Sequence, residues 1–532
     1  MTQIEAAQLI SQRGARRRRM VLASCTLATC AYNFEPPLWI YRPVPREAFN
    51  QAANTFDIAS GLFSLALLAL ILVGGVIGDL RGRRRVLLVG LGGLVVANLL
   101  LPLSRAVPWF AFTRVLAGAF GALVLPVSLS LLYLAYADLP EARKRAVAVY
   151  VLLTSVALLL SGPIALLTHQ ALDWRAPIAL PTALGTIALL MALRTTTESR
   201  AHSERRLDAI GNTAWTLVVL SVIGTFVAWR GSGLYAVLGW ALALTGLLIS
   251  AGLLAWWGRQ TREAIFGQSL IRRRTLLILI LFGFAMEFGS IGYVVQVRQV
   301  LIHVYGYGTV LSTVALMPLL LGMGSMTLYT ASRLVAAEPR RQLALAILGV
   351  GVACAVTALT GAAFYPLLAL LLFAFGAAMV LATITWTAAF LTAMPDDVVG
   401  VRTGINSAVF QMGAILGSLA CGALLVQYGS AIYERLLTSA GVAEDRIDRA
   451  LAALNTLIDP AVAAAELPTD IAGRLLAGYE IAYLDAFSRV LLIVALVCAL
   501  SAALAWFGLP RRGTTAPRGA IGAALTGEEQ RS

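Results

Sequence analysis

The residues of this chain that could do chemistry are few, and they are charged side chains placed inside long apolar segments. The sequence contains no nucleophile–base set, no Walker-type phosphate loop and no cluster of metal ligands. Its three histidines lie at or beyond the ends of apolar segments. Charges within hydrocarbon are costly and mark functional sites by default. The candidates for proton coupling or substrate contact are therefore Glu287, Glu35 and Arg114.

Glu287 lies about halfway along the apolar segment 275–299, roughly 18 Å deep at about 1.5 Å per residue. Gly283, Gly289 and Ser290 surround it in sequence, and their small side chains leave room for a cavity. Burial away from water favours the neutral form of a carboxyl group. We therefore expect Glu287 to take up and release a proton. The alternative is a protonated glutamate that makes one hydrogen bond between packed helices.

Glu35 and Arg114 belong to apolar segments 20–41 and 109–134, which must cross the membrane in opposite directions. Both residues then lie roughly 7–8 Å below the same surface at about 1.5 Å per residue. We expect them to form an ion pair, because each charge relieves the burial of the other. The alternative is that Glu35, which precedes Pro36, ends its helix in a hydrated vestibule.

A short run of glycine, aspartate and arginine joins two of the apolar segments. Its key residues are Gly75, Asp79, Gly82, Arg83 and Arg84. Such a concentration of arginine cannot lie in hydrocarbon, so the run predicts a tight basic turn between two membrane helices. The Asp79 carboxylate can meet these arginines and the N-terminus of a helix from the opposite half, where backbone N–H groups favour an anion. We expect Asp79 to act as a gate and not as a substrate contact.

The composition is that of a polytopic membrane protein. Of the 532 residues, 59% are hydrophobic and only 13% are charged, against about 25% charged residues in soluble domains. Windows long enough to span hydrocarbon predict about fourteen helices. Their ranges are 20–41, 57–80, 86–104, 109–134, 146–168, 176–193, 213–230, 234–257, 275–299, 308–330, 343–364, 366–394, 401–428 and 488–508.

Most of the 41 basic residues fall in alternate loops between these helices. By the positive-inside rule, this asymmetry predicts that both termini and the linker 194–212 are cytoplasmic and that the loop 429–487 is extracytoplasmic. The net charge of +14 then reflects orientation and contact with anionic lipid, and no nucleic acid is expected as a partner. The five cysteines lie in apolar segments without zinc-ligand spacing, so we expect packing residues and no metal or cofactor.

The basic turn resembles the signature loop of the major facilitator superfamily, G-x-x-x-D-(R/K)-x-G-(R/K)-(R/K), with Leu80 where a basic residue is usual. The run from Arg114 through Gly118 to Gly121 resembles the R-x-x-x-G region of the fourteen-helix drug–proton antiporter branch, the EmrB/QacA type. That branch usually has an aspartate and the pattern T-x-x-N-x-A-L-P in its first helix. The pattern is missing here, so Glu35 is a substitute in role and not an aligned match.

Gly162 and Pro163 resemble the helix bend G-P-x-x-G-G of the antiporters, although Leu166 and Leu167 replace its closing glycines. Segments 292–318 and 404–417 resemble the branch's Y-L-P-x-Y-x-Q…G-Y-S…L-P and G-x-x-N…Q-x-G-x-x-x-G patterns. Candidates for lining a cavity, each with ordinary helix packing as the alternative, are Gln296, Gln299, Trp386, Asn406 and Gln411.

The resemblance implies an all-α membrane protein with two six-helix bundles, 20–193 and 275–508, and two extra helices, 213–257, between them. The remaining pieces are the cytoplasmic segments 1–19, 194–212, 258–274 and 509–532. Transport would proceed by alternating access, in which the two bundles rock about a central cavity.

The implied function is secondary active transport, namely proton-coupled export of hydrophobic or amphipathic small molecules, by a monomer in a bacterial inner membrane. The partners are then membrane lipid, protons and a small-molecule substrate, and the protein is not an enzyme. Two alternatives stay open: proton-coupled uptake of a specific metabolite, and a non-transporting membrane sensor or lipid-handling partner. The few acids in the expected cavity argue against dicationic substrates.

Overall fold

The computed structural model describes residues 3–35, 53–172, 175–200, 208–230, 233–260, 274–332, 338–361, 364–393, 399–439, 441, 447 and 469–510. The secondary structure of this part of the chain is helical, without a β-strand, which confirms the predicted fold class. Twelve of its helices are long and apolar enough to span a membrane. Two further long helices, α1 and α9, lie where the first and seventh helices are predicted.

The first group of helices precedes the linker after Thr195. Its members are α1 (Gln3–Asn33), α4 (Ala53–Arg81), α5 (Arg83–Leu100), α6 (Val107–Ala135), α7 (Pro140–Ala171) and α8 (Ala179–Thr195). The first helix differs from the predicted range 20–41, because it begins earlier and ends at Asn33. Its early end is consistent with Pro36 and Pro37, since proline has no N–H to continue a helix and restricts the residue before it.

The second group follows the extra helices α9 (Ala209–Arg230) and α10 (Gly233–Gln260). Its members are α12 (Arg274–His303), α13 (Thr309–Val314), α14 (Met317–Ser332), α15 (Pro339–Thr360), α16 (Tyr365–Thr392), α17 (Val399–Ser439) and α20 (Thr469–Gly508). The predicted helix 308–330 is therefore two helices. Pro318 lies at the start of α14, where its missing N–H needs no partner within the helix.

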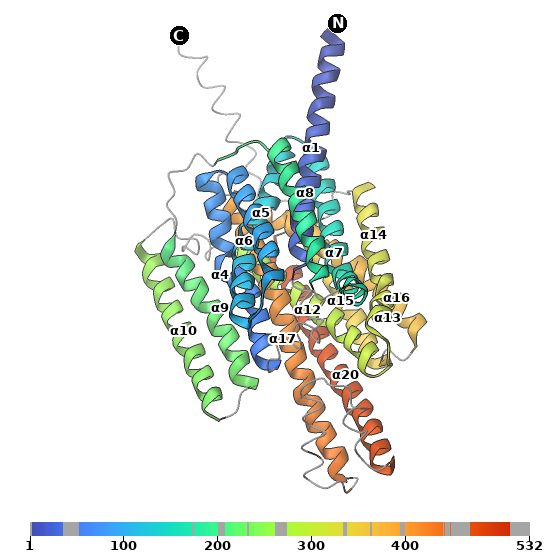
Figure 1. The fold of residues 1–532 in the computed structure, drawn as a ribbon. Coiled ribbons are helices and arrows are strands. Elements are labelled where there is room, and N and C mark those ends of the chain that lie inside the picture. The colour runs from blue at the N-terminus through green and yellow to red at the C-terminus, as the bar shows by residue number, and fades with distance from the viewer. Residues whose placement is uncertain are drawn as a thin grey trace.

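The predicted loop 429–487 is partly helical, which corrects its boundaries. The helix α17 continues to Ser439 and α20 begins at Thr469, so both project beyond the other helices at the end away from the start of α1 (Figure 1). Tyr433 and Tyr479 are buried in this extension and pack edge to face, with ring centroids 6.0 Å apart. Residues 440–468 lie outside the described part except for 441 and 447.

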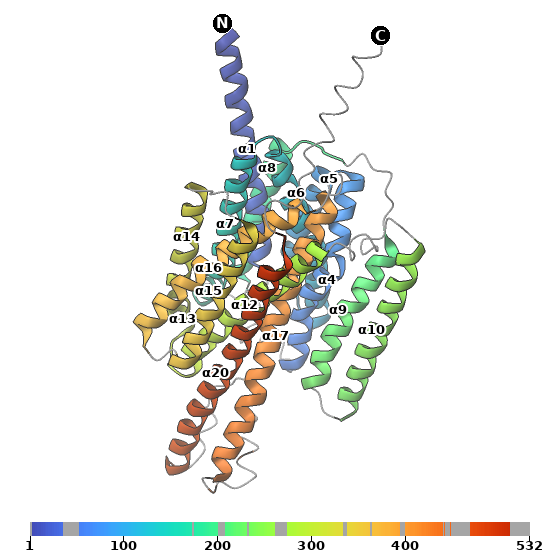
Figure 2. The same cartoon turned by 180° about the vertical axis from the view of Figure 1, so that it is seen from behind.

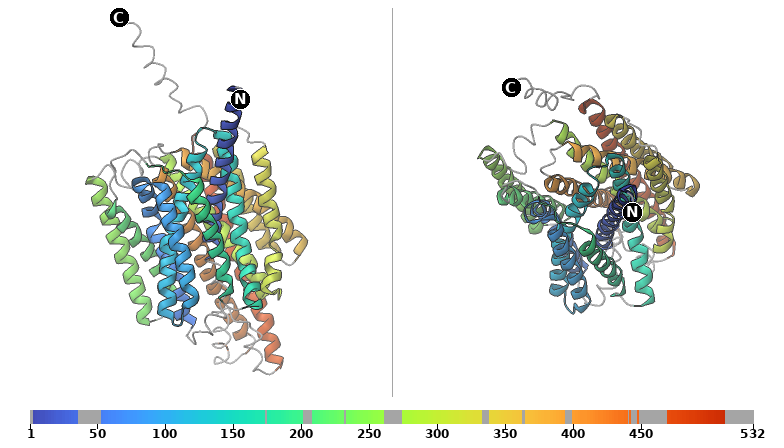
Figure 3. Two further views of the ribbon diagram at one scale, coloured as in Figure 1. Left: turned by 45° about the horizontal axis from the view of Figure 1, so that its top comes forward. Right: turned by 90° about the horizontal axis from the view of Figure 1, so that it is seen from above.

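The helices pack as two groups that meet along a central interface (Figures 1 and 2). In the first group α4 and α5 pack on α6, and α1 packs on α8. In the second, α12 packs on α17, α14 on α16 and α15 on α20. The groups meet where α17 contacts α4 and α6 and where α7 contacts α14 and α16. The view from above shows the pair α9 and α10 at the edge of the molecule (Figure 3).

Small residues set the closest helix contacts. A Cβ on Gly118 of α6 would collide with the carbonyl oxygen of Phe63 on α4. A Cβ on Gly417 of α17 would likewise collide with that of Phe288 on α12. Because lipid offers apolar contact as readily as protein does, close backbone packing is what favours helix association in a membrane. These glycines therefore help fix the positions of the helices that carry the candidate residues.

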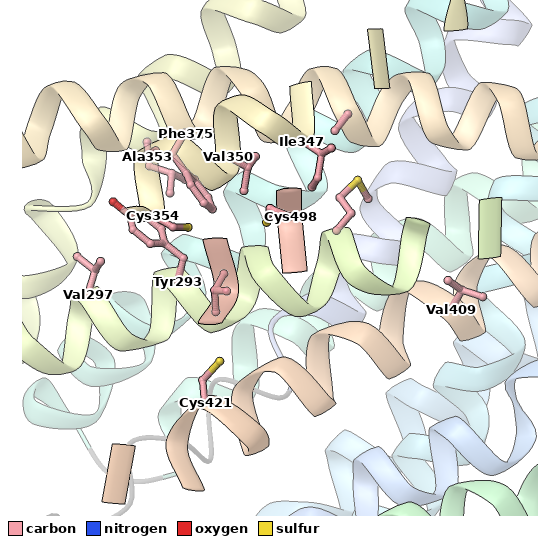
Figure 4. Close-up of a cluster of buried hydrophobic side chains, with 14 of the residues drawn as sticks. Tyr293, Val297, Ile347, Val350, Ala353, Cys354, Phe375, Val409, Cys421 and Cys498 are labelled. Carbon is pink, nitrogen blue, oxygen red and sulfur yellow. The ribbon is translucent and has the colours of Figure 1, made fainter. Parts of the chain in front are cut away.

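The core of the second group is filled by aromatic side chains and thiols (Figure 4). The rings of Tyr293 and Phe375 stack at 4.3 Å between centroids, and the Tyr293 hydroxyl lies 2.9 Å from Thr357 Oγ1. Cys354 and Cys498 are buried, free thiols in the same cluster. Among the described residues there is no group of side chains able to hold a metal ion.

One end of the bundle is marked by arginines, and we call it the basic end. It contains Arg81, at which α4 ends, and the first turns of α5 and α17. Here Arg17 and Arg18 of α1 donate to the carbonyl oxygens of Thr195 and Ala135, at 3.3 and 3.2 Å. These carbonyls end α8 and α6, and cations are favourable at helix C-termini. The arginines thus tie α1 to two neighbouring helices.

Candidate functional site

Glu35 and Arg114 form an ion pair inside the first group of helices. Arg114 Nη1 donates to Glu35 Oε2 at 2.6 Å, and the side chains are 1% and 0% exposed. Their positions relative to the helix ends differ from those expected, because α1 ends two residues before Glu35 and α6 begins seven residues before Arg114. A turn at the end of α1 holds Glu35, whose backbone N–H donates to the Tyr32 carbonyl at 2.9 Å.

Aromatic rings cover this ion pair. The Arg114 guanidinium lies 4.5 Å from the centroid of the Phe63 ring, and Phe63 stacks on Tyr32 at 5.7 Å. The rings exclude water, so the two charges interact in a medium of low dielectric constant. Removing either partner would leave a buried charge that is not compensated by the other. The two opposite charges compensate each other, so the pair can lie within the membrane without net charge at the site.

Glu287 lies in the middle of α12 and is fully buried. Neither of its carboxyl oxygens has a hydrogen-bond partner among the described residues, and the nearby Ser290 hydroxyl has none either. Gly413 of α17 packs against the Glu287 side chain, where an added Cβ would come within 2.9 Å of the Glu287 Cβ. Glu287 is thus a carboxyl group held at the contact between α12 and α17. Unlike Glu35, it has no ionic partner among the described residues.

Asp79 joins the two groups of helices at the basic end. Its Oδ1 accepts from the Gly400 N–H at 3.0 Å, and its Oδ2 accepts from the Val401 N–H at 3.2 Å. Both donors belong to the first turn of α17, whose N–H groups have no partners within the helix and carry the positive end of its dipole. Arg83 donates to the same carboxylate. A side chain on Gly75 would collide with the Gly400 carbonyl oxygen, so α4 and α17 are in close contact and this end is closed.

The turn after Asp79 depends on glycine and on the linker that follows α8. Gly82 has φ 104° and ψ 126°, a conformation that residues with a Cβ rarely adopt. The carboxylate of Glu198 accepts from the Arg84 backbone N–H at 3.1 Å and forms an ion pair with Arg85 at 3.6 Å. Glu198 is not among the residues predicted from the sequence, because nothing in a polar linker signals that it folds back onto a turn more than a hundred residues earlier.

The secondary candidates are divided between buried and half-buried positions. Gln296 and Asn406 are buried, whereas Gln299 and Gln411 are half-buried. Trp386 is fully buried, and its indole N–H donates to the Leu279 carbonyl oxygen at 2.7 Å while its ring fills the space beside Gly283. Trp386 thereby links α16 to α12, which corresponds to the packing alternative stated for it.

Gly162 and Pro163 lie within α7, which continues through them as one helix from Pro140 to Ala171. The predicted helix bend at these residues stays a prediction.

Two residues that the sequence analysis did not single out meet beside the Asp79 contact. Arg402, in the first turn of α17, is fully buried, and its guanidinium lies 5.4 Å from the centroid of the Tyr133 ring on α6. The sequence places Arg402 among the loop arginines that indicate orientation. Burial and an aromatic partner from another helix can be seen only in the folded chain.

Residues 20–418 match the family model described as the Major Facilitator Superfamily. The chain therefore belongs to this superfamily of membrane transporters, which confirms the resemblance found in the sequence.

Its relatives include efflux and resistance proteins of actinobacteria. The "Multidrug efflux pump LfrA" of Mycolicibacterium smegmatis is 24% identical over 478 residues, which is 87% of this chain and 90% of that protein. The "Tetracenomycin C resistance and export protein" of Streptomyces glaucescens is 26% identical over 388 residues, covering 68% of this chain and 67% of that protein.

Solved structures share the fold at low sequence identity. The proton:xylose symporter XylE aligns with TM-score 0.56 and 12% identity, covering 94% of this chain and 97% of its own. The human organic anion transporter MFSD10 aligns with TM-score 0.54 and 16% identity, covering 91% of this chain and 99% of its own. These likenesses concern the fold alone.

Proposed function

We propose that this protein is a proton-coupled exporter of hydrophobic or amphipathic small molecules. The observation that carries the proposal is Glu287, a carboxyl group in the middle of a membrane helix without a hydrogen-bond partner among the described residues. The multidrug efflux and tetracenomycin C export for which its relatives are named support the same direction of transport. The protein works as a monomer in the bacterial cytoplasmic membrane.

In the proposed orientation the basic end faces the cytoplasm, because arginine-rich loops are retained on that side. The termini and the residues of the 194–212 linker then lie inside, and the projecting ends of α17 and α20 lie outside. The contact of Asp79 with Gly400 and Val401 supports a conformation closed toward the cytoplasm. Alternating access requires that this contact break when substrate enters from the cytoplasm or the inner leaflet.

In the proposed cycle, Glu287 exchanges its proton for substrate. Protonated Glu287 is neutral and suits the apolar contact between α12 and α17. Release of the proton to the cytoplasm leaves a carboxylate, which favours binding of an amphipathic cation or hydrogen-bond donor. After the bundles rock, a proton from outside neutralises the carboxylate and displaces the substrate. The Glu35–Arg114 pair stays internally compensated throughout.

The test compares Glu287→Gln with the wild type in proteoliposomes, with ethidium and a neutral lipophilic dye as probes. Glutamine imitates the protonated carboxyl group and cannot release a proton. We expect Glu287→Gln to abolish accumulation driven by a pH gradient while downhill exchange of dye stays measurable. The matched control is Glu480→Gln, which changes an exposed carboxylate on the projecting part of α20.

Uphill transport by Glu287→Gln at the wild-type rate would place the coupling site elsewhere, with Glu35 as the next candidate. A wild type whose transport is indifferent to the pH gradient would contradict proton coupling itself.

A further inference from the structure

A second contact between the two groups of helices lies next to the Asp79 contact and has different chemistry. Arg402 of α17 faces the ring of Tyr133 on α6, with 5.4 Å from its guanidinium carbon to the ring centroid. This is within the distance of about 6 Å at which a cation is attracted to an aromatic face. Tyr133 is 6% exposed and Arg402 is 0% exposed, so the interaction takes place away from water.

Each partner is fixed by its own group of helices. Arg402 Nη1 donates to the carbonyl oxygen of Leu391, which lies in the last turn of α16. Tyr133 is held by Arg143 of α7, whose guanidinium carbon lies 4.3 Å from the same ring centroid. The Arg402–Tyr133 contact therefore joins two side chains that are already positioned. Its formation requires little additional ordering, which is the main entropic cost of a side-chain contact.

Apolar side chains surround the contact and belong to both groups. Tyr133 of α6, Leu391 of α16 and Val399 of α17 form one buried cluster, with Leu134 packed against it. These contacts exist only while the basic end is closed, because α6 belongs to one group and α16 and α17 to the other. Arg402 would keep its hydrogen bond to Leu391 after opening, but it would lose the ring.

We propose that Tyr133 and Arg402 form a second latch that holds the basic end closed, in addition to Asp79. The latch shares the first turn of α17 with the Asp79 contact, but it reaches that turn from α6 instead of α4. A contact present in one of two conformations shifts their equilibrium by the free energy it contributes there. Tyr133 and Arg402 are thus positioning residues that set how readily the protein opens, and they need not touch substrate.

Amide hydrogen exchange tests the latch directly in the full-length protein in lipid nanodiscs. Opening of the basic end frees the Gly400 and Val401 N–H groups from Asp79, so their exchange rate reports the equilibrium population of the open form. Tyr133→Leu keeps an apolar side chain in the cluster and removes the ring. We expect it to raise exchange in 399–403 about tenfold, within the strength of a desolvated cation–aromatic contact.

Two matched variants separate the latch from general loosening. Tyr133→Phe retains the ring, and we expect exchange within about twofold of the wild type. Arg143→Gln removes a cation that positions the ring but leaves Arg402 and Tyr133 in place, so we expect a smaller rise in 399–403 than in Tyr133→Leu. The double variant Tyr133→Leu with Arg402→Gln should exchange no faster than Arg402→Gln alone, because both changes remove the same contact. Unchanged exchange in α12 shows in each case that the fold is intact.

The latch is contradicted if Tyr133→Phe or Arg143→Gln raises exchange as much as Tyr133→Leu does. It is also contradicted if the increases in exchange caused by Tyr133→Leu and Arg402→Gln add in the double variant. The inference rests on the proposed function only in treating opening of this end as a step of transport. Exchange is measured without substrate, so the two can fail separately. If exchange changes as expected but transport is not coupled to protons, the latch stands and the proposed function is contradicted. If transport is coupled to protons but Tyr133→Leu leaves exchange unchanged, the proposed function stands and the latch is contradicted.

Discussion

Three of the four buried carboxyl side chains among the described residues, Glu35, Asp79 and Glu287, differ in what surrounds them, and the difference predicts what each does. Glu35 is paired with Arg114, Asp79 receives N–H groups of α17 together with Arg83, and Glu287 has no hydrogen-bond partner among the described residues. An ionic partner or N–H donors compensate the charge of a buried carboxylate, whereas a carboxyl group without them can be neutralised only by a proton. For this reason the coupling role is assigned to Glu287 and the gating role to Asp79.

Asp79→Asn is expected to impair turnover more than substrate binding. The amide keeps the shape of the side chain but loses the charge that favours the N-terminus of α17, so one global conformation is destabilised while the cavity is unaltered. Binding of dye at equilibrium and initial rates of transport in proteoliposomes measure the two effects separately. Asp485→Asn, an exposed carboxylate paired with Arg489, is the control. Weakened binding with unchanged turnover is the outcome that this role of Asp79 does not allow.

Glu35→Gln and Arg114→Gln are each expected to lower thermal stability strongly, because each leaves one buried charge without its partner. The loss is about 3–5 kcal/mol for a buried pair in a soluble protein. The double variant removes both charges, so its melting temperature should lie above that of either single variant. Melting is followed by tryptophan fluorescence in detergent. A double variant less stable than both single variants would show that the two side chains do not act as a pair.

At the scale of single elements, the turn between α4 and α5 is the structure on which the gate depends. It brings Arg83 to Asp79 and the Arg84 backbone N–H to Glu198 of the linker after α8, around a glycine in a conformation that other residues rarely adopt. The carboxylate of Glu198 also occupies the space into which a Cβ on Gly82 would point. Both backbone and packing therefore require glycine at this position.

Gly82→Ala is expected to destabilise the protein by about 1–3 kcal/mol, the range for a non-glycine residue held in a sparsely populated backbone conformation. Gly92→Ala is the matched control, because Gly92 lies within α5 with open space where a Cβ would be and is expected to be neutral or slightly stabilising. Melting temperatures of the two variants, measured side by side, decide the point. Equal melting temperatures would mean that the turn relaxes at little cost.

The elements differ in how well their limits could be predicted from the sequence. Spans of apolar residues locate the membrane helices, because hydrocarbon demands a minimum length of apolar chain. The same criterion ends α17 too early and begins α20 too late. Their projecting parts are amphipathic and are held by buried residues such as Tyr433 and Tyr483, so they contain no apolar run. The end of α1 was placed too late, although Pro36 is a local signal for it.

On the scale of the whole molecule, contacts between distant segments decide which candidates meet. Opposite helix directions were enough to expect the Glu35–Arg114 ion pair, and a familiar loop pattern was enough to point to Asp79. The Tyr133–Arg402 contact could not be expected in this way, because it depends on how α6 approaches α17. Hydropathy and charge give the number and direction of the helices, whereas their rotation and depth follow from packing, much of it at glycines.

Among the described residues, two groups of helices are closed at the basic end and the uncompensated carboxyl group of Glu287 lies between α12 and α17. Closure is attributed to contacts of α17 with α4 and α6, and energy coupling to Glu287. These are separable properties, since one concerns the equilibrium between conformations and the other the exchange of a proton for substrate. A variant of the gate should alter rates without altering the proton requirement, and a variant of Glu287 should do the opposite.

Proton movement driven by substrate alone would show directly whether transport is coupled to protons through Glu287. Proteoliposomes are loaded with a lumenal pH-sensitive dye, and a gradient of ethidium is imposed across them without a pH gradient. The account predicts that the wild type moves protons against the direction of ethidium flow and that Glu287→Gln transports ethidium downhill with no change in lumenal pH. Ethidium transport by the wild type without any proton movement, or proton movement that persists in Glu287→Gln, would contradict it.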